Sequence, residues 1–319
     1  MIVTVTLNAA IDRTLTVPNF RPGHRHRASD GLTLAGGKGI NIARALKRLE
    51  VPVVATGLAG GRTGTRIVEE LTAEAILNDF VRIGDESRTS TAVLDPTAGS
   101  YSEINEWGPY VEPEEIEFLF EKLRYLSRGA EFVVFAGSLP RGVDDGFYAE
   151  AIRELNRLQV RTVLDSEGPP LSRGIEAEPF LVSPNQREAE DLVGQELSED
   201  EDFIQALEQI ADMGARNGLI TFESGCYARL REERSVRLLK ATAVRMEPIS
   251  PVGTGDVLLA GFLGAWSEVR PAEEALRSAV AAGAAATLEA GAGRFDTREA
   301  ARILHDVHVA ELVPAESRF

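Results

Sequence analysis

The chain has 319 residues, enough to bury a sizeable core as one large α/β domain with a small appendage. Its 34 Lys and Arg against 50 Asp and Glu give a net charge of −16, which argues against nucleic acid or an anionic membrane as a partner. With one cysteine, Cys226, no signal-peptide pattern and no apolar run of about 18 residues, a cytoplasmic location without an internal disulfide is expected.

Strand-like and helix-like segments alternate along most of the chain. The predicted strands are 1–7, 51–57, 131–136, 160–165, 179–182 and 219–222. The predicted helices are 40–49, 64–75, 116–126, 147–158, 188–193, 202–216 and the alanine-rich 272–290. This alternation predicts an α/β fold built from parallel βαβ units, with a doubly wound, mostly parallel sheet.

Two segments, 11–34 and 88–107, interrupt the alternation. Both are strand-like with alternating polar residues, and neither contains a helix, so we expect them to pair as a small separate sheet. The remaining residues, 1–10, 35–87 and 108–319, then form the α/β core. A basic run at 21–27 is expected either to add positive potential near the small sheet or to lie on a solvated edge strand.

A glycine-rich stretch precedes the first predicted helix. It is no Walker A loop, because the earlier glycine is missing and Ile40 stands where Ser or Thr would bind magnesium. No strand is followed by G-x-G-x-x-G, so a nicotinamide site is unsupported. Gly36 and Gly37 allow close backbone approach to a ligand, while Lys38 and Asn41 add a charge and a directional polar group on one helix face. A tight turn before a helix would explain the glycines alone.

A second glycine-rich stretch, ISPVGTGD at 249–256, runs into an apolar helix-forming segment. Gly253, Thr254 and Gly255 would direct backbone N–H groups at one spot of a helix N-terminus, which suits an anion. Asp256 has the wrong charge for such a cradle, unless it serves as a base beside developing negative charge. The alternative is an ordinary helix cap.

Polar motifs follow several predicted strands, at 8–12, 137–140, 165–166 and 183–188, and also precede Asp256. Because ligands of parallel α/β sheets bind beyond the carboxyl ends of the strands, these motifs are expected along one rim. Within the last motif, Asn185 and Glu188 share one face of a first helical turn, as polar ligands or as a capping box.

The motifs GGKGxN at 36–41 and GTGD at 253–256 resemble the two signatures of the PfkB/ribokinase family of sugar kinases. The opening TLNAAIDRT at 6–14, GSLP at 137–140 and SPNxxE at 183–188 are similar to its phosphosugar branch, which holds 1-phosphofructokinase and tagatose-6-phosphate kinase. The five landmarks stand in family order over nearly the whole chain. The resemblance implies a ribokinase-like fold in which the small sheet is a lid over the sugar site.

The resemblance also implies an activity: transfer of the γ-phosphoryl group of ATP, with Mg²⁺, to a hydroxyl of a hexose monophosphate. Conversion of fructose 1-phosphate to fructose 1,6-bisphosphate is the leading candidate. Kinases of tagatose 6-phosphate, fructose 6-phosphate or a nucleoside are alternatives, as is a ligand-binding relative with weakened nucleotide binding. A homodimer formed through the lid is implied as well.

Residue roles follow by matching positions in the motifs. Asp256 would be the base, and the N–H groups around Gly253, Thr254 and Gly255 would stabilise the transferred group. The residues assigned to the sugar phosphate are Asp12, Gly36, Gly37, Lys38, Asn41, Arg88 and Ser138. Those assigned to the nucleotide are Ser183, Asn185, Thr221, Glu223, Gly225, Gly283 and Gly291. Asn185 and Glu188 would organise Mg²⁺ through water.

The chain departs from the family pattern mainly at the nucleotide. Ser183 stands where this branch often has lysine, and TFESGC at 221–226 replaces the usual Gly-Ala-x-Gly turn. Glu223 thereby adds a carboxylate where ATP's negative charge is expected, and Gly291 takes a place often held by asparagine. These changes leave the catalytic motif intact and put the identity and affinity of the nucleotide in question.

Overall fold

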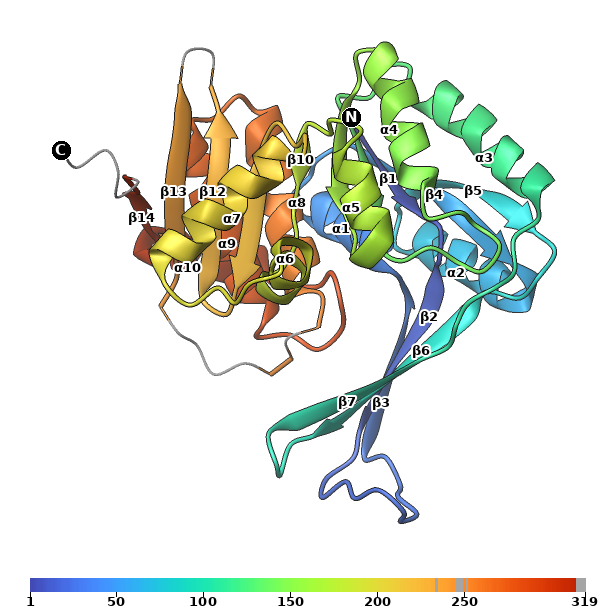
Figure 1. The fold of residues 1–319 in the computed structure, drawn as a ribbon. Helices are drawn as coiled ribbons and strands as arrows, with labels where there is room; N and C mark the ends of the chain where they lie inside the picture. The colour runs from blue at the N-terminus through green and yellow to red at the C-terminus, as the bar shows by residue number, and fades with distance from the viewer. Residues whose placement is uncertain (233–234, 245–248, 251, 314–319) are drawn as a thin grey trace.

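The computed structural model describes residues 1–232, 235–244, 249–250 and 252–313. In this part of the chain, a ten-stranded sheet lies between two layers of helices, and a four-stranded sheet projects away from that core (Figure 1). The alternation of strands and helices in the sequence therefore yields the expected layered α/β fold. Pro251 of the second glycine-rich stretch lies outside the described residues.

The large sheet is mostly parallel, as predicted. Its order is β14-β13-β12-β11-β10-β9-β8-β1-β4-β5, with parallel pairing from β11 to β5 and antiparallel pairing from β11 to β14. Its strands are β1 (Ile2–Thr6), β4 (Val53–Gly60), β5 (Leu77–Ile83), β8 (Phe132–Ala136), β9 (Arg161–Asp165), β10 (Leu181–Val182), β11 (Gly218–Phe222), β12 (Gly225–Arg231), β13 (Val236–Thr242) and β14 (His308–Glu311).

The helices cover both faces of this sheet. One layer holds α1 (Lys38–Arg48), α2 (Gly61–Ala73), α8 (Thr254–Ser267), α9 (Ala272–Ala286) and α10 (Thr297–Ile303). The other holds α3 (Pro113–Leu126), α4 (Phe147–Arg157), α5 (Gly168–Ile175), α6 (Gln186–Val193) and α7 (Asp200–Asp212). Successive strand residues face opposite layers, so Ile2 joins one apolar core and Val3 the other. No helix among the described residues is both long and apolar enough to cross a membrane.

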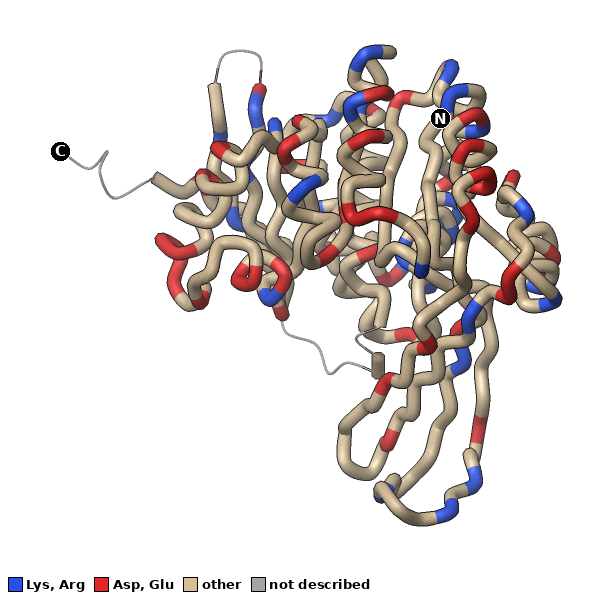
Figure 2. The backbone as a smooth tube through the Cα atoms, turned by 45° about the vertical axis from the view of Figure 1, so that its right-hand side comes forward, with Lys and Arg blue, Asp and Glu red and all other residues tan. Residues whose placement is uncertain are grey.

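The small sheet contains β2 (Ala10–Thr16), β3 (Asp30–Gly36), β6 (Arg88–Asp95) and β7 (Ser100–Asn105), in the order β3-β2-β6-β7. The pairing of β2 with β6 is parallel and the other two pairings are antiparallel. The two interrupting segments thus pair with each other as expected. The basic run 21–27 lies in the exposed loop between β2 and β3, at the tip farthest from the core (Figure 2), and not on an edge strand.

Several elements were missed in the sequence, and one helix end was misplaced. The strands β5, β12, β13 and β14 and the helices α5 and α10 were not predicted. The predicted α9 extended to residue 290, whereas the helix ends at Ala286. After Ala286 the chain continues in turns closed by i→i−3 hydrogen bonds, and the Thr287 carbonyl accepts hydrogen bonds from the backbone N–H groups of Ile249 (2.7 Å) and Ser250 (3.1 Å). This contact ties the segment before α8 to the end of α9.

Candidate active site

A cavity of about 1110 Å³ opens at the carboxyl ends of the parallel strands. Its wall includes residues that follow β1, β8, β9 and β10, the first turn of α8, and the base of the small sheet. The motifs expected along one rim therefore meet around one space, as the strand topology requires. Of the predicted site residues, all but Gly36 and Gly291 line this cavity.

Asp256 is buried in the first turn of α8. The helix begins after Gly253, which has the left-handed φ of 77°, and a Cβ there would lie 2.7 Å from the Cβ of Ala292. Only glycine fits this position. The backbone N–H groups of a first helical turn lack acceptors within the helix, so the wall at Gly255 and Asp256 suits an anion.

The environment of Asp256 changes its acidity. Burial raises the pKa of Asp256 to about 8, and the nearby Asp165 carboxylate adds to the rise, while Lys38 and Asn41 oppose it. A carboxylate whose pKa approaches the working pH is suited to accept a proton from a hydroxyl.

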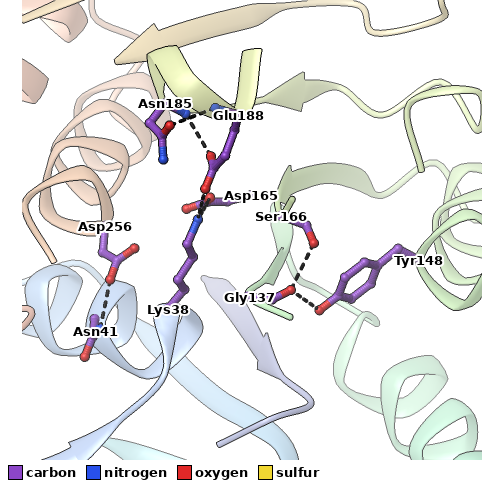
Figure 3. Close-up of polar contacts among 9 residues, drawn as sticks. All are labelled: Lys38, Asn41, Gly137, Tyr148, Asp165, Ser166, Asn185, Glu188 and Asp256. Atoms are coloured by element: carbon purple, nitrogen blue, oxygen red, sulfur yellow. Dashed lines mark hydrogen bonds and ion pairs between the residues drawn. The ribbon is translucent and has the colours of Figure 1, made fainter. Parts of the chain in front are cut away.

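Asn41 holds the Asp256 side chain. Its Nδ2 donates to Asp256 Oδ2 over 2.8 Å, and both side chains are buried (Figure 3). The buried Arg44 donates from one guanidinium nitrogen to Asn41 Oδ1 over 3.3 Å and also binds Glu74 with two nitrogens, at 2.6 and 2.8 Å. Since Asn41 Oδ1 accepts from Arg44, its amide nitrogen is the atom that faces Asp256.

Lys38 lies between two carboxylates in the same cavity. Its Nζ is 2.8 Å from Asp165 Oδ1 and 3.1 Å from Glu188 Oε1, which joins α1, β9 and α6 (Figure 3). Burial alone would lower the pKa of Lys38, but the two carboxylates hold it above its usual value. Burial also raises the pKa of Glu188. Lys38 is therefore a charged group in the cavity wall.

Asn185 and Glu188 form a reciprocal capping box at the start of α6. Asn185 Oδ1 accepts from the Glu188 N–H over 2.9 Å, and Glu188 Oε2 accepts from the Asn185 N–H over 2.9 Å. The capping prediction is confirmed. The other carboxylate oxygen of Glu188, Oε1, accepts a hydrogen bond from Lys38 Nζ. The backbone of Asn185 forms an isolated parallel β-bridge with Thr221, which brings these two residues side by side.

The oxygen donors here fit a hydrated magnesium ion. Within the described residues, no group of three His, Cys, Asp or Glu side chains could enclose a metal. Asp165 and Glu188 nevertheless bring two carboxylates to one wall. Mg²⁺ commonly takes one or two carboxylates together with waters and phosphate oxygens, so this donor set suits it.

The turn after β8 is fixed by buried hydroxyls. Gly137 has a φ of 96°, and its carbonyl accepts from Tyr148 Oη (2.9 Å) and Ser166 Oγ (3.0 Å), as Figure 3 shows. Ser138 Oγ accepts from Asn8 Nδ2 over 3.2 Å. These bonds hold Ser138 at the cavity wall.

Asn8 and Asp165 were not among the predicted site residues. Asn8 Oδ1 is buried and has no hydrogen-bond partner among the described residues, although its residue lines the cavity. Both residues belong to polar motifs at the ends of predicted strands, and this location could have marked them as site residues.

At the base of the small sheet, Asp12 and Arg88 line the cavity together. Burial raises the pKa of Asp12 to about 6, and the charge of Arg88 opposes this rise. Arg88 Nε donates to the Asn8 carbonyl over 3.2 Å, and Nη1 donates to Asn105 Oδ1 over 3.3 Å. Gly36 lies behind Asp12: a Cβ there would be 2.0 Å from Asp12 Oδ2, so Gly36 makes room for that carboxylate.

The residues predicted for the nucleotide lie at the other end of the cavity, with one correction. Ser183, Thr221, Glu223, Gly225 and Gly283 line its wall. In contrast, Gly291 packs against the small sheet, where a Cβ would lie 2.8 Å from Leu32 and 2.9 Å from Leu34. Its φ of 98° requires glycine for this close approach, which explains the residue without a nucleotide.

The comparisons with known proteins agree with this geometry. A family model described as pfkB family carbohydrate kinase matches residues 2–298. The chain belongs to this family. It is similar to 1-phosphofructokinase of Bacillus subtilis, 32% identical over 285 residues that cover 89% of this chain and 92% of the relative. It is also similar to tagatose-6-phosphate kinase of Staphylococcus epidermidis, 28% identical over 319 residues that cover 98% and 100%.

Solved structures agree in fold. Phosphofructokinase-2 of Escherichia coli, in complex with substrates and products, superposes with a TM-score of 0.87 at 28% identity, covering 95% of this chain and 98% of that one. Ribokinase of Arabidopsis thaliana gives a TM-score of 0.73 at 21% identity, covering 95% and 98%, which supports the fold alone. This PfkB kinase is a sugar kinase with a ribokinase-like fold, a phosphotransferase with an alcohol group as acceptor.

Proposed function

We propose that this PfkB kinase transfers the γ-phosphoryl group of ATP to a hydroxyl of a hexose monophosphate, with fructose 1-phosphate as the first candidate. The observation that carries the proposal is the buried Asp256 with its raised pKa, held by Asn41 in the same cavity that Arg88 lines. A base and a guanidinium within one cavity match an acceptor that carries both a hydroxyl and a phosphate.

The chemistry requires positioning more than covalent steps. Asp256 accepts the proton of the attacking hydroxyl, and the N–H groups of the first turn of α8 stabilise charge on the transferred phosphoryl oxygens. Asn185 and Glu188 would organise Mg²⁺ through bound water, and the ion would neutralise phosphate charge. Lys38 lies between Glu188 and Asp165 and adds a fixed positive charge to the wall.

The small sheet is proposed to act as a lid, formed by 11–34 and 88–107. Its base supplies Asp12, Arg88 and Glu106 to the cavity. Closing it over bound substrates would exclude water and limit hydrolysis of ATP. Because ATP is the proposed phosphoryl donor, a cytoplasmic location remains our expectation.

A coupled assay over a panel of acceptors tests the proposal. The panel holds fructose 1-phosphate, fructose 6-phosphate, tagatose 6-phosphate, fructose and a nucleoside, each with ATP and with GTP. We expect turnover of a hexose phosphate with a kcat/KM far above that of free fructose. Tagatose 6-phosphate is the second candidate, because the similar protein of Staphylococcus epidermidis carries that name. Equal activity on fructose and on its phosphates would overturn the proposal.

The lid is also proposed to join two copies of the chain. All six residues of its edge strand β7 are exposed, and Tyr101 and Ile104 are apolar members of that strand. An exposed edge strand is a template for pairing with another chain. Light scattering is expected to give twice the mass of the chain, and Ile104→Asp to lower it. The control Val269→Asp, at an exposed site on the core, should not change the mass.

A further inference from the structure

The side chain of Trp107 is unusual in its position. It is 87% exposed although it lines the large cavity, in the segment that leads from β7 back to the core. A large aromatic side chain left in water forgoes the stabilisation that burial would bring. The only other tryptophan, Trp266, packs instead on Phe262 in the core, with ring centroids 5.2 Å apart.

The backbone on both sides of Trp107 is held in place. Gly108 has a φ of 86°, and a Cβ there would lie 2.2 Å from Asn8 Oδ1, so the chain passes close to Asn8. Arg141 Nε donates to the Gly108 carbonyl over 3.0 Å. On the other side, the Glu106 carboxylate accepts from the Thr89 N–H over 2.8 Å. The indole is thus presented at the cavity by an anchored segment.

The two residues before Trp107 contact the Arg88 guanidinium, which the proposed function assigns to the phosphate of the acceptor. Arg88 Nη1 donates to Asn105 Oδ1 over 3.3 Å and to the Glu106 carbonyl over 3.5 Å, immediately before Trp107 in the chain. A sugar bound with its phosphate at Arg88 would bring its ring within reach of this segment. Sugar rings carry C–H groups, which are electropositive, and the faces of aromatic rings are electronegative.

We propose that the indole of Trp107 packs against the C–H face of the bound sugar phosphate and so determines which acceptor is used. The inference rests on the proposed function and deepens it, because it names a contact to the sugar ring in addition to those with its phosphate and hydroxyl. Burial of the indole on binding accounts for its exposure in the free protein. The indole would favour acceptors whose sugar ring fits against it, whereas Arg88 would favour acceptors that carry a phosphate.

Fluorescence and kinetics test this contact. The emission of the parent minus that of Trp107→Phe isolates Trp107 without altering the core. Titration with the sugar phosphate that the parent phosphorylates is expected to shift this difference emission to shorter wavelength, with a midpoint near the KM. Inorganic phosphate should leave it unchanged. Trp107→Ala is expected to raise the KM for that sugar phosphate roughly 10-fold or more while leaving the KM for ATP within about twofold, and Trp107→Phe should retain most of the parent affinity.

A matched control is Tyr125→Ala, which removes an exposed aromatic of α3 that neither lines the cavity nor belongs to the small sheet. It should leave the KM for the sugar phosphate unchanged. The inference is overturned if the parent turns over a hexose phosphate while the Trp107 emission stays constant at saturation. It is equally overturned if the emission follows protein concentration instead of sugar, which would make Trp107 an interface residue. A parent enzyme that turns over no hexose phosphate would instead refute the proposed function, and the inference with it.

Discussion

The amide nitrogen of Asn41 lies 2.8 Å from Oδ2 of Asp256, a hydrogen bond between two buried side chains 215 residues apart in the sequence. It joins the two glycine-rich stretches, at the starts of α1 and α8, into one site (Figure 3). The bond favours the ionised form of Asp256, against burial, which disfavours it. Burial therefore raises the pKa of the proposed base, and a residue far away in the sequence limits that rise.

This relationship predicts the pH dependence of the reaction. Only the ionised carboxylate accepts a proton, so kcat/KM should rise with pH through the raised pKa of Asp256 and level off above it. Asn41→Ala removes a hydrogen bond to a charged group, which contributes about 1.5–3 kcal/mol. The rise of kcat/KM with pH in Asn41→Ala should therefore occur roughly one to two pH units higher than in the parent. Ser138 lines the same cavity and its hydroxyl bonds to Asn8, so Ser138→Ala is the control and should leave the pH profile in place. An unshifted pH profile in Asn41→Ala would contradict the assignment.

Arg88→Ala is expected to raise the KM for the sugar phosphate far more than the KM for ATP. The guanidinium lines the acceptor end of the cavity, and loss of a charge-assisted contact costs roughly 1.5–3 kcal/mol, or about 10- to 150-fold in affinity. Arg88→Lys keeps the charge but not the planar fork, so it should fall between parent and Arg88→Ala. Steady-state kinetics with each substrate varied in turn check this, and an equal rise in both KM values would count against it.

Glu223→Gln is expected to tighten the binding of a nonhydrolysable ATP analogue modestly. Glu223 lines the nucleotide end of the cavity, and its charge is unfavourable beside a polyphosphate. The residue is exposed, so solvent screening limits the gain to about two- to fivefold. Titration calorimetry at low and high salt measures it. The gain in affinity should shrink with added salt. Equal affinities of the parent and Glu223→Gln at low salt would contradict repulsion between Glu223 and the nucleotide.

Arg44→Met should destabilise the fold. Arg44 is buried and bonds to Glu74, to Asn41 and to the carbonyls of Ala35 and Ala292. Glu74 is only partly buried, so the loss of its buried partner Arg44, with the bonds to Asn41 and to two carbonyls, should cost about 1–3 kcal/mol. Urea unfolding should show this loss. Arg66→Met, which breaks an exposed pair with Glu70 within α2, is the control and should cost less than about 1 kcal/mol.

The sequence was informative where local patterns decide structure. The alternation of strands and helices predicts the parallel sheet. The polar motifs after the strands predict a site along the carboxyl edge of that sheet. The spacing of Asn185 and Glu188 predicts the capping box that the structure has. The antiparallel strands β12 and β13 break that alternation and were missed. Long-range pairs also escaped prediction. Nothing local indicates that Lys38 meets Asp165, 127 residues away, or that Gly36 is needed to make room for Asp12.

The most direct test of the account is the turnover of Asp256→Asn with the sugar phosphate that the parent uses best. The pKa of Asp256 is higher in the folded protein than the value near 4 expected for the unfolded chain. Folding therefore opposes ionisation of this carboxyl, and the protein loses stability as the pH rises above about 4. The neutral amide of Asp256→Asn avoids this loss, so it should not lower the unfolding temperature. Sugar phosphate binding, by calorimetry, should stay within about twofold of the parent. The account predicts a loss of kcat of about 100- to 10,000-fold. A variant that folds, binds the sugar phosphate and keeps more than about a tenth of the parent kcat would contradict the assignment of Asp256 as the base.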